Sequence, residues 1–194
     1  MTIVFYLLLV QGILGAFDTL YYHEWRARLP ARYPQTAPEL KLHAARDFLY
    51  AVLFLSLPAV EWRGAWTWVL ATVLLAEIGL TLTDFVVECR VRRTFGDVVP
   101  GERVTHAVMG ILYGAMAANL LPTLIRWHAL PTGLDASTVE VPAMLRYALL
   151  LLGLGVAASG VRDLYAAYGL PYGGWPWPAP GDEVGGRVAG ESTR

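Results

Sequence analysis

The chain has 194 residues, of which 56% are hydrophobic and only 16% charged, and its formal net charge is −1. Soluble domains are about 45–50% apolar and about 25% charged, so this composition argues against a soluble enzyme and predicts a membrane protein. The lack of a basic excess argues against nucleic acid as a partner. The single cysteine, Cys89, excludes an intramolecular disulfide framework and a Cys-rich zinc or iron–sulfur site.

Five apolar stretches approach the length of about 20 residues that a helix needs to cross a bilayer. They predict an all-α, polytopic membrane protein over residues 1–168, with spans near 2–22, 40–60, 65–87, 104–125 and 141–165. We expect the first four helices to form a four-helix bundle core, with the fifth packed outside it. The second stretch has a short uninterrupted apolar run, 48–57, and a four-span alternative leaves it as an interfacial helix.

Basic residues set the expected orientation, because loops rich in Lys and Arg face the cytoplasm. Most of them lie after the first and third stretches: Arg26, Arg28, Arg32, Lys41, Arg90, Arg92, Arg93 and Arg103. We therefore expect a multi-pass protein of the cell membrane with its N-terminus outside. Residues 169–194, rich in glycine, proline and tryptophan, then form a cytoplasmic tail.

The second stretch begins with a helix start signal. Thr36 and Glu39 have the spacing of a capping box, in which side chains bond free backbone N–H groups of the first turn. Pro38 suits the same turn. The pattern predicts a helix that starts here and gives Glu39 a capping role.

Ionisable side chains inside the predicted spans gather toward the cytoplasmic face. Such groups are costly in lipid, so each needs a partner or a function. His43 and Asp47 are four residues apart and share a helix face, as do Glu102 and His106. These two pairs predict an inward-facing His–carboxylate site.

The third stretch adds a row of acids with a seven-then-four spacing, which also gives one helix face. The expected metal ligands are His43, Asp47, Glu77, Asp84, Glu88 and His106, with Asp18, Glu24 and Glu102 as additional candidates. The side chains expected to support the site or orient a substrate are Tyr22, Arg46, Tyr50, Arg103 and Tyr113.

Carboxylates combined with imidazoles suit non-haem iron or manganese. A haem between His43 and His106 is less favoured, because a haem pocket does not need the surrounding acids. The arrangement resembles the ferritin-like di-iron carboxylate bundles, in which two helices give a Glu each and two give a Glu-x-x-His pair. This chain has no Glu-x-x-His, and its own pairs have four-residue spacing. By analogy, we expect an oxidoreductase that acts on a lipid-like or quinol substrate.

Two other interpretations stay open. In the first, the buried charges form a structural network in a non-enzymatic accessory or assembly subunit of a larger membrane complex, with arginines neutralising the acids. In the second, carboxylates relay protons or cations across the membrane: Asp18, Asp47, Glu77 and Asp84. His23 is expected to be an interfacial histidine, and His128 lies on the opposite side. Trp175 and Trp177 in the tail are expected to contact membrane lipids.

Overall fold

The computed structural model describes residues 1–177, so the predicted tail is covered only from 169 to 177. Its long helices are α1 (Thr2–Phe17), α2 (Ala37–Ser56), α3 (Trp66–Val91), α4 (Pro100–His128) and α5 (Ala143–Ala167). Shorter elements join them: the π-helix η1 (Asp18–Ala27), the 3-10 helices η2 (Leu29–Arg32) and η3 (Arg92–Thr94), and the strands β1 (Val60–Arg63) and β2 (Gly133–Ala136). The described chain is mostly helical, and the all-α prediction is confirmed to that extent.

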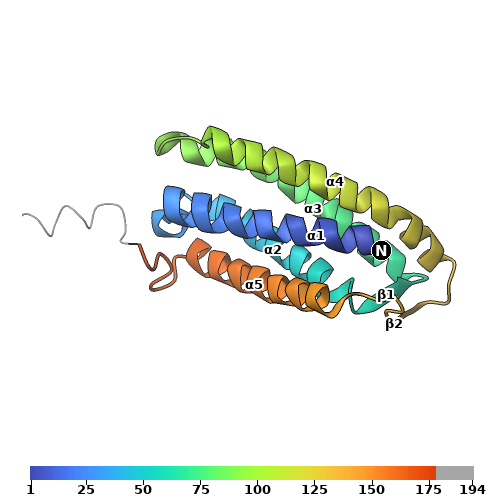
Figure 1. The fold of residues 1–194 in the computed structure, drawn as a ribbon. Coiled ribbons are helices and arrows are strands. Elements are labelled where there is room, and N and C mark those ends of the chain that lie inside the picture. The colour runs from blue at the N-terminus through green and yellow to red at the C-terminus, as the bar shows by residue number, and fades with distance from the viewer. Residues whose placement is uncertain (178–194) are drawn as a thin grey trace, which may run out of the picture.

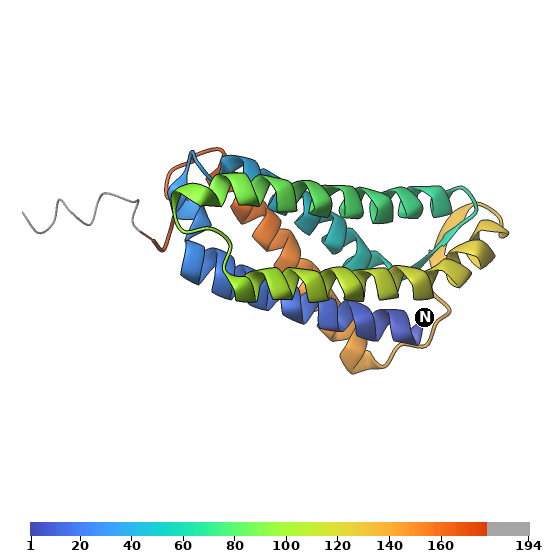
Figure 2. The ribbon, with the colours of Figure 1, turned by 90° about the horizontal axis from the view of Figure 1, so that it is seen from above.

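The helices form one bundle in which α1 lies between α4 and α5, with α2 and α3 behind it (Figure 1). The N-terminus and both strands lie at one end, which we call the strand end; η1 and the α3–α4 connection lie at the other, which we call the η1 end (Figure 2). α5 contacts α2 and also α1. The expectation that the fifth helix packs outside a four-helix core is therefore wrong, because α5 is an integral wall of the bundle.

Two glycines of α5 explain this close contact. A Cβ atom on Gly153 would lie 2.7 Å from the Leu55 side chain, and one on Gly160 would lie 3.2 Å from the Ala44 carbonyl oxygen. Small residues let two helix backbones approach, a common packing mode in lipid. The same glycines bring the C-terminal half of α5 against the polar half of α2.

Four helical segments are long and apolar enough to cross a membrane: Thr2–Ala27, Trp66–Thr94, Pro100–His128 and Ala143–Ala167. Their outward faces are apolar, and large side chains such as Leu75, Ile111 and Leu151 are about 70% exposed. α2 is not one of the four. Length and composition thus suggest a membrane protein, with α2 as the helix that differs from the rest.

A short antiparallel sheet, which the sequence did not predict, closes the strand end. β1 pairs with β2, Val60 facing Ala136 and Arg63 facing Gly133. The Glu61 carboxylate accepts hydrogen bonds from Thr138 Oγ1 (2.7 Å) and Arg63 Nη2 (2.6 Å), and these contacts lower the pKa of Glu61. The sheet therefore ties the α2–α3 connection to the α4–α5 connection.

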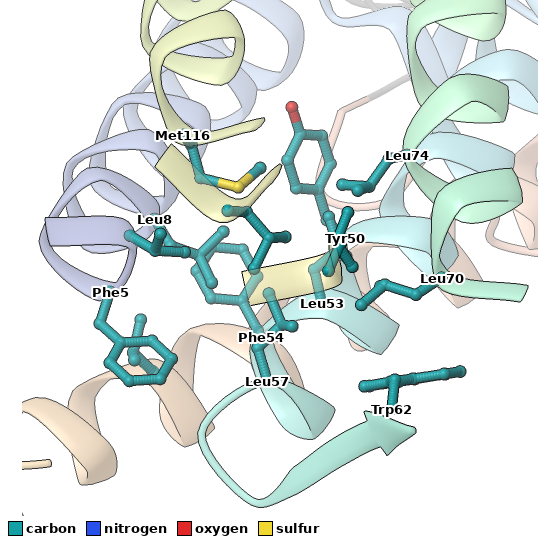
Figure 3. Close-up of a cluster of buried hydrophobic side chains, with 14 of the residues drawn as sticks. Phe5, Leu8, Tyr50, Leu53, Phe54, Leu57, Trp62, Leu70, Leu74 and Met116 are labelled. Atoms are coloured by element: carbon teal, nitrogen blue, oxygen red, sulfur yellow. The ribbon is translucent and has the colours of Figure 1, made fainter. Parts of the chain in front are cut away.

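Between the strand end and the middle of the bundle, the core is mainly apolar, with a few buried uncharged polar residues such as Gln11, Thr67 and Thr123. Figure 3 shows Phe5 and Leu8 from α1 meeting Leu53 and Phe54 from α2. Further members come from α2 and its C-terminal end, from β1, and from α3, α4 and α5: Tyr50, Leu57, Trp62, Leu70, Leu74, Tyr113, Met116, Leu120, Leu124, Trp127, Leu145 and Leu149 among them. We call this set the apolar core.

At the η1 end, residues 169–177 turn back onto the bundle. Gly169, with φ of +63°, ends α5 in the left-handed conformation that glycine adopts without strain. Arg162 donates a hydrogen bond of 2.6 Å to the Trp175 carbonyl oxygen, and the Trp177 ring meets the Trp25 ring edge-on at 6.0 Å. The described part of the predicted tail is therefore packed against η1; the rest of it, 178–194, lies outside the described residues.

Candidate metal centre

Buried ionisable side chains occupy the η1 end of the bundle core. Each is at most 8% exposed, and together we call them the polar cluster: Asp18, His23, Glu39, His43, Glu77, Asp84, Glu88, Arg92, Glu102, His106 and Asp163. They come from η1, α2, α3, η3, α4 and α5. All five helical segments of the bundle thus contribute residues to the polar cluster. These residues are far apart in the sequence and come together only when the chain folds.

The π-helical geometry of η1 places two of these residues together. A π-helix bonds residues five apart, so Asp18 and His23 lie one above the other. His23 Nε2 lies 3.3 Å from Asp18 Oδ2. In an α-helix, five-residue spacing would turn His23 away from Asp18, and for this reason the sequence prediction of an interfacial histidine is wrong: His23 is 8% exposed.

His106 is the centre of the first group of donors. Its Nε2 lies 3.1 Å from Asp18 Oδ2, and its Nδ1 lies 3.7 Å from Glu88 Oε2 on the other side of the ring. The Phe85 ring stacks on the imidazole at 5.4 Å and fixes its plane. Glu102 Oε1, one helical turn before His106, lies 3.3 Å from His23 Nε2.

His43 is the centre of a neighbouring group. Its ring stacks on that of His23 with centroids 4.5 Å apart. Its Nε2 lies 3.3 Å from Asp84 Oδ2, and its Nδ1 lies 3.8 Å from Asp163 Oδ2. The three histidines therefore form one continuous set of rings lined with carboxylates on both sides.

Two arginines supply counter-charges. Arg92, 1% exposed, bonds Glu39 Oε1 through Nη2 at 2.6 Å and reaches Glu102 Oε1 through Nη1 at 2.7 Å. Arg46 Nη1 bonds Asp84 Oδ2 at 2.8 Å, and its Nε lies 3.7 Å from Glu77 Oε1. Arg92 thus links carboxylates from α2 and α4, and Arg46 of α2 ties that helix to two carboxylates of α3.

The charges of the polar cluster do not balance. Seven of its members are carboxylic acids, and they outnumber the two arginines and three histidines together even if every imidazole carries a proton. An unpaired buried charge is strongly unfavourable. The cluster therefore calls for added positive charge, from bound cations or from protons on the acids.

Several donor atoms of the polar cluster also lack a hydrogen-bond partner within residues 1–177. They are fully buried: Asp18 Oδ1, His23 Nε2, Glu39 Oε2, His43 Nδ1 and Nε2, Asp84 Oδ1, Glu88 Oε2 and His106 Nδ1. Buried polar atoms are normally satisfied. Imidazole nitrogens and carboxylate oxygens left unsatisfied in one place are what a metal ion would coordinate.

Two sets of donors converge closely enough to share an ion. They are Asp18 with His23 and His106, and Glu88 with Glu102 and His106, with the donor atoms of each set within 4.8 Å of one another. Metal–ligand bonds of about 2.0–2.2 Å place adjacent donors roughly 3 Å apart. The first set, with its contacts of 3.1 and 3.3 Å, already has that spacing.

Of the predicted ligands, the structure places His43, Asp84, Glu88 and His106 inside the polar cluster. Asp18 and Glu102, two of the three additional candidates, belong to the converging donor sets. Glu77 is at its edge, where it accepts a hydrogen bond from Thr81 at 2.7 Å.

Two predicted ligands lie beyond the polar cluster. Asp47 lines a neighbouring cavity between α1, α2 and α5. Glu24 pairs with Arg162, so its charge is already neutralised. Neither belongs to the two converging donor sets.

The predicted supporting residues divide in the same way. Arg46 contacts the cluster directly. Tyr50 and Tyr113 lie where the polar cluster meets the apolar core, with ring centroids 6.0 Å apart. Tyr22 lies against Gly101, and Arg103 is about half exposed and pairs with Asp97 at 3.1 Å, so neither reaches the donor atoms.

Four members of the cluster were missed as site residues. His23 was hidden by the π-helix. Glu39 was assigned to a capping box, which is wrong because Thr36 Oγ1 donates to the Leu29 carbonyl oxygen at 2.8 Å while Glu39 binds Arg92. Arg92 was counted as a loop charge, and Asp163 was placed on an outer helix. The predicted spans hold more acidic than basic residues. That imbalance was the one sequence signal from which Glu39 and Arg92 could have been predicted as members of the site.

Comparison with known protein families, curated proteins and solved structures finds no match to this chain. The resemblance to the ferritin-like bundles that the sequence suggested is therefore limited to the types of donor. Function has to be argued from the polar cluster itself.

Proposed function

We propose that the chain is an integral membrane metalloprotein that holds one or two non-haem iron or manganese ions in the polar cluster. The ligands of the first ion are Asp18, His23 and His106. Glu88 and Glu102 complete the site or bind a second ion on the Nδ1 side of His106. The observation that carries this proposal is the convergence of buried nitrogen and oxygen donors within 4.8 Å, in residues that also hold donor atoms without hydrogen-bond partners.

The choice of metal follows from the donors. Carboxylate oxygens and imidazole nitrogens without thiolates suit iron or manganese better than soft metals. The excess of carboxylates also favours an ion of charge two or more. A haem held by His43 and His106 is disfavoured, because His23 and several carboxylates stand between and around these rings.

The membrane arrangement is part of the proposal. We infer that the four apolar segments span the bilayer and that α2 crosses with them as a fifth helix, shielded by α3 and α5. From the basic residues of η1, η2 and η3 we infer that the η1 end faces the cytoplasm at the cell membrane and that the N-terminus lies outside. The metal then lies within the bundle near the cytoplasm.

For such a centre we propose oxidoreductase chemistry on a lipid-like or quinol substrate, with dioxygen as the electron acceptor. Iron and manganese change oxidation state readily, and a bundle surrounded by lipid gives apolar substrates direct access. The protein would supply binding, orientation and a set of carboxylates able to accept protons released by the substrate.

One observation favours a different role. Arg92 links carboxylates from α2 and α4, and Arg46 joins α2 to two carboxylates of α3, as a structural network would. In that alternative the chain is a non-enzymatic accessory or assembly subunit, and the remaining acids are protonated. It predicts a folded protein that takes up no metal and needs a partner complex.

Elemental analysis of the purified protein separates the two. Protein made without a polyhistidine tag and reconstituted with Fe²⁺ or Mn²⁺ should contain about one or two ions per chain. His23→Ala/His106→Ala should remove the metal, and His128→Ala, which changes an exposed histidine at the strand end, should keep it. Metal-free wild type after reconstitution, or metal retained by the double variant, would overturn the proposal. Oxygen uptake with a quinol then tests the oxidoreductase role.

A further inference from the structure

A cavity of about 430 Å³ lies between α1, α2 and α5 and ends at the polar cluster. Its body is apolar, with walls from Phe54, Met109, Leu152 and Val156. Its inner end is formed by polar side chains, among them Asp18, His23, His43 and Arg46. The cavity thus has the amphipathic lining of a site for a small molecule with one polar group.

The cavity opens sideways between α1 and α5. Leu20 of η1 and Leu151 of α5 line it and are 67% and 70% exposed. Gly155, also lining and exposed, has no neighbour within 4 Å of the position that a Cβ would take. The opening is therefore on the apolar outer surface of the bundle, which in a membrane faces lipid.

The polar end offers both donors and acceptors without partners. Gln11 Oε1 and Asp18 Oδ1 are acceptors without a hydrogen bond, and Arg46 Nε is a donor without one, its nearest acid being Glu77 at 3.7 Å. Both nitrogens of His43 are unsatisfied as well. A hydroxyl group donates and accepts a hydrogen bond at once, so it matches this set of atoms.

The charges that line the polar end restrict the kind of headgroup that the cavity can bind. The polar end is lined by three acids, Asp18, Asp47 and Asp163, by one arginine, Arg46, and by two histidines. With neutral imidazoles, the acids outnumber the arginine three to one. A carboxylate or phosphate headgroup would meet repulsion from these acids. A neutral headgroup avoids that penalty.

We propose that this cavity binds a neutral, hydroxyl-bearing amphiphile that enters from the bilayer between α1 and α5. Its apolar body fills the space beside Phe54 and Leu152, and its hydroxyl group reaches the polar cluster. Quinols and long-chain alcohols share this chemistry. The inference rests on the proposed function in one respect: Asp18 and His23 wall the cavity and are also proposed metal ligands, so the bound amphiphile would be the substrate class of that centre.

Binding of tritiated dodecan-1-ol to the full chain in nanodiscs tests the proposal by scintillation proximity. Unlabelled competitors are dodecan-1-ol, a hydroquinone with a dodecyl chain, and dodecanoate. We expect saturable binding, competition by both hydroxyl compounds, and dodecanoate weaker by about tenfold or more. The better of the two hydroxyl competitors identifies a quinol or an alkyl lipid as the source.

Gly155→Leu should fill the opening and weaken binding by about tenfold, because nothing else occupies that space. Gly79→Leu is the matched control: Gly79 is an exposed glycine of α3 with equally open space around it, and it does not line the cavity. The control should bind like the wild type. Wild-type binding by Gly155→Leu, or dodecanoate binding as well as the alcohol, would overturn the proposal.

Metal content measured on the same samples keeps the two proposals separate. Alcohol binding by a protein that takes up no metal would support the cavity and overturn the metal centre. Metal uptake without saturable alcohol binding would overturn the cavity proposal alone. Gly155→Leu that keeps its metal but loses the alcohol would support both.

Discussion

The two halves of this bundle are built from the same helices and differ in chemistry at one depth. On α2, the inward stripe reads Glu39 and His43 in the polar half, then Leu53 and Phe54 in the apolar half. α3, α4 and α1 change in the same way at the same level. Tyr50 and Tyr113, each with a ring and a hydroxyl, stand at the change. The helical period thus fixes which residues face inward. The position of an inward-facing residue along the helix determines whether it belongs to the polar cluster or to the apolar core.

Satisfaction of polar groups is the second difference. The strand end also has a buried acid, Glu61, but its oxygens accept hydrogen bonds from Arg63 and Thr138. At the η1 end, Asp84 and Glu88 keep oxygens without partners among the described residues. The buried acid of the strand end is thus satisfied by neighbouring residues. The acids of the η1 end require a bound cation or protons to balance their charge.

The largest expected effect comes from removing a counter-charge at the η1 end. Arg92→Met leaves the buried Glu39 and Glu102 unpaired, which should lower the free energy of unfolding of the metal-free protein by about 3–5 kcal/mol. Bound metal should reduce that loss, because the cation replaces part of the missing charge. Denaturant titration with and without metal measures both values. Equal losses in the two states would contradict a metal site beside Arg92.

In the apolar core, Leu53→Ala should cost about 3 kcal/mol, since Leu53 is fully buried and the cavity left behind cannot be filled. The same titration measures it. Metal content and affinity should stay as in the wild type, because no donor atom changes position. Loss of metal in this variant would show that the two halves are coupled rather than independent.

At the strand end, Glu61→Gln should cost about 1 kcal/mol at neutral pH, the worth of one or two weakened hydrogen bonds. The pKa of Glu61 is lowered in the folded protein, so its stabilising effect is present above the ordinary carboxyl value and is lost as the pH falls below it. Wild type should therefore lose more thermal stability than the variant between pH 5 and pH 3. Parallel melting curves for the two proteins would contradict this assignment.

The long helices and part of the polar cluster could be predicted from the sequence. Apolar runs predicted five helical segments, and the four-residue and seven-residue spacings placed Glu77, Asp84 and Glu88 on one buried face of α3, as found. Those inferences needed only the α-helical period. The ligand roles of these residues remain predictions.

The rest depended on contacts between distant segments. Asp163 reaches His43 only because Gly153 and Gly160 let α5 approach α2. Glu39 matched a local capping pattern, yet its partner Arg92 is 53 residues away. A local sequence pattern does not predict an ion pair between residues so far apart in the chain. The pair became evident only from the packing of the folded protein.

The π-helix η1 also says something about how a centre like this can arise. In an α-helix, residues four apart lie on one face; Asp18 and His23 are five apart and still meet. Relative to an α-helical precursor, the difference is a single extra residue between the two donors. Such an insertion keeps the Asp–His pair together but rotates everything after it, including Glu24 and Trp25, by about one α-helical step of roughly 100°. A one-codon change could therefore have redirected this end of the chain toward α5 without dismantling the pair of side chains that the site depends on.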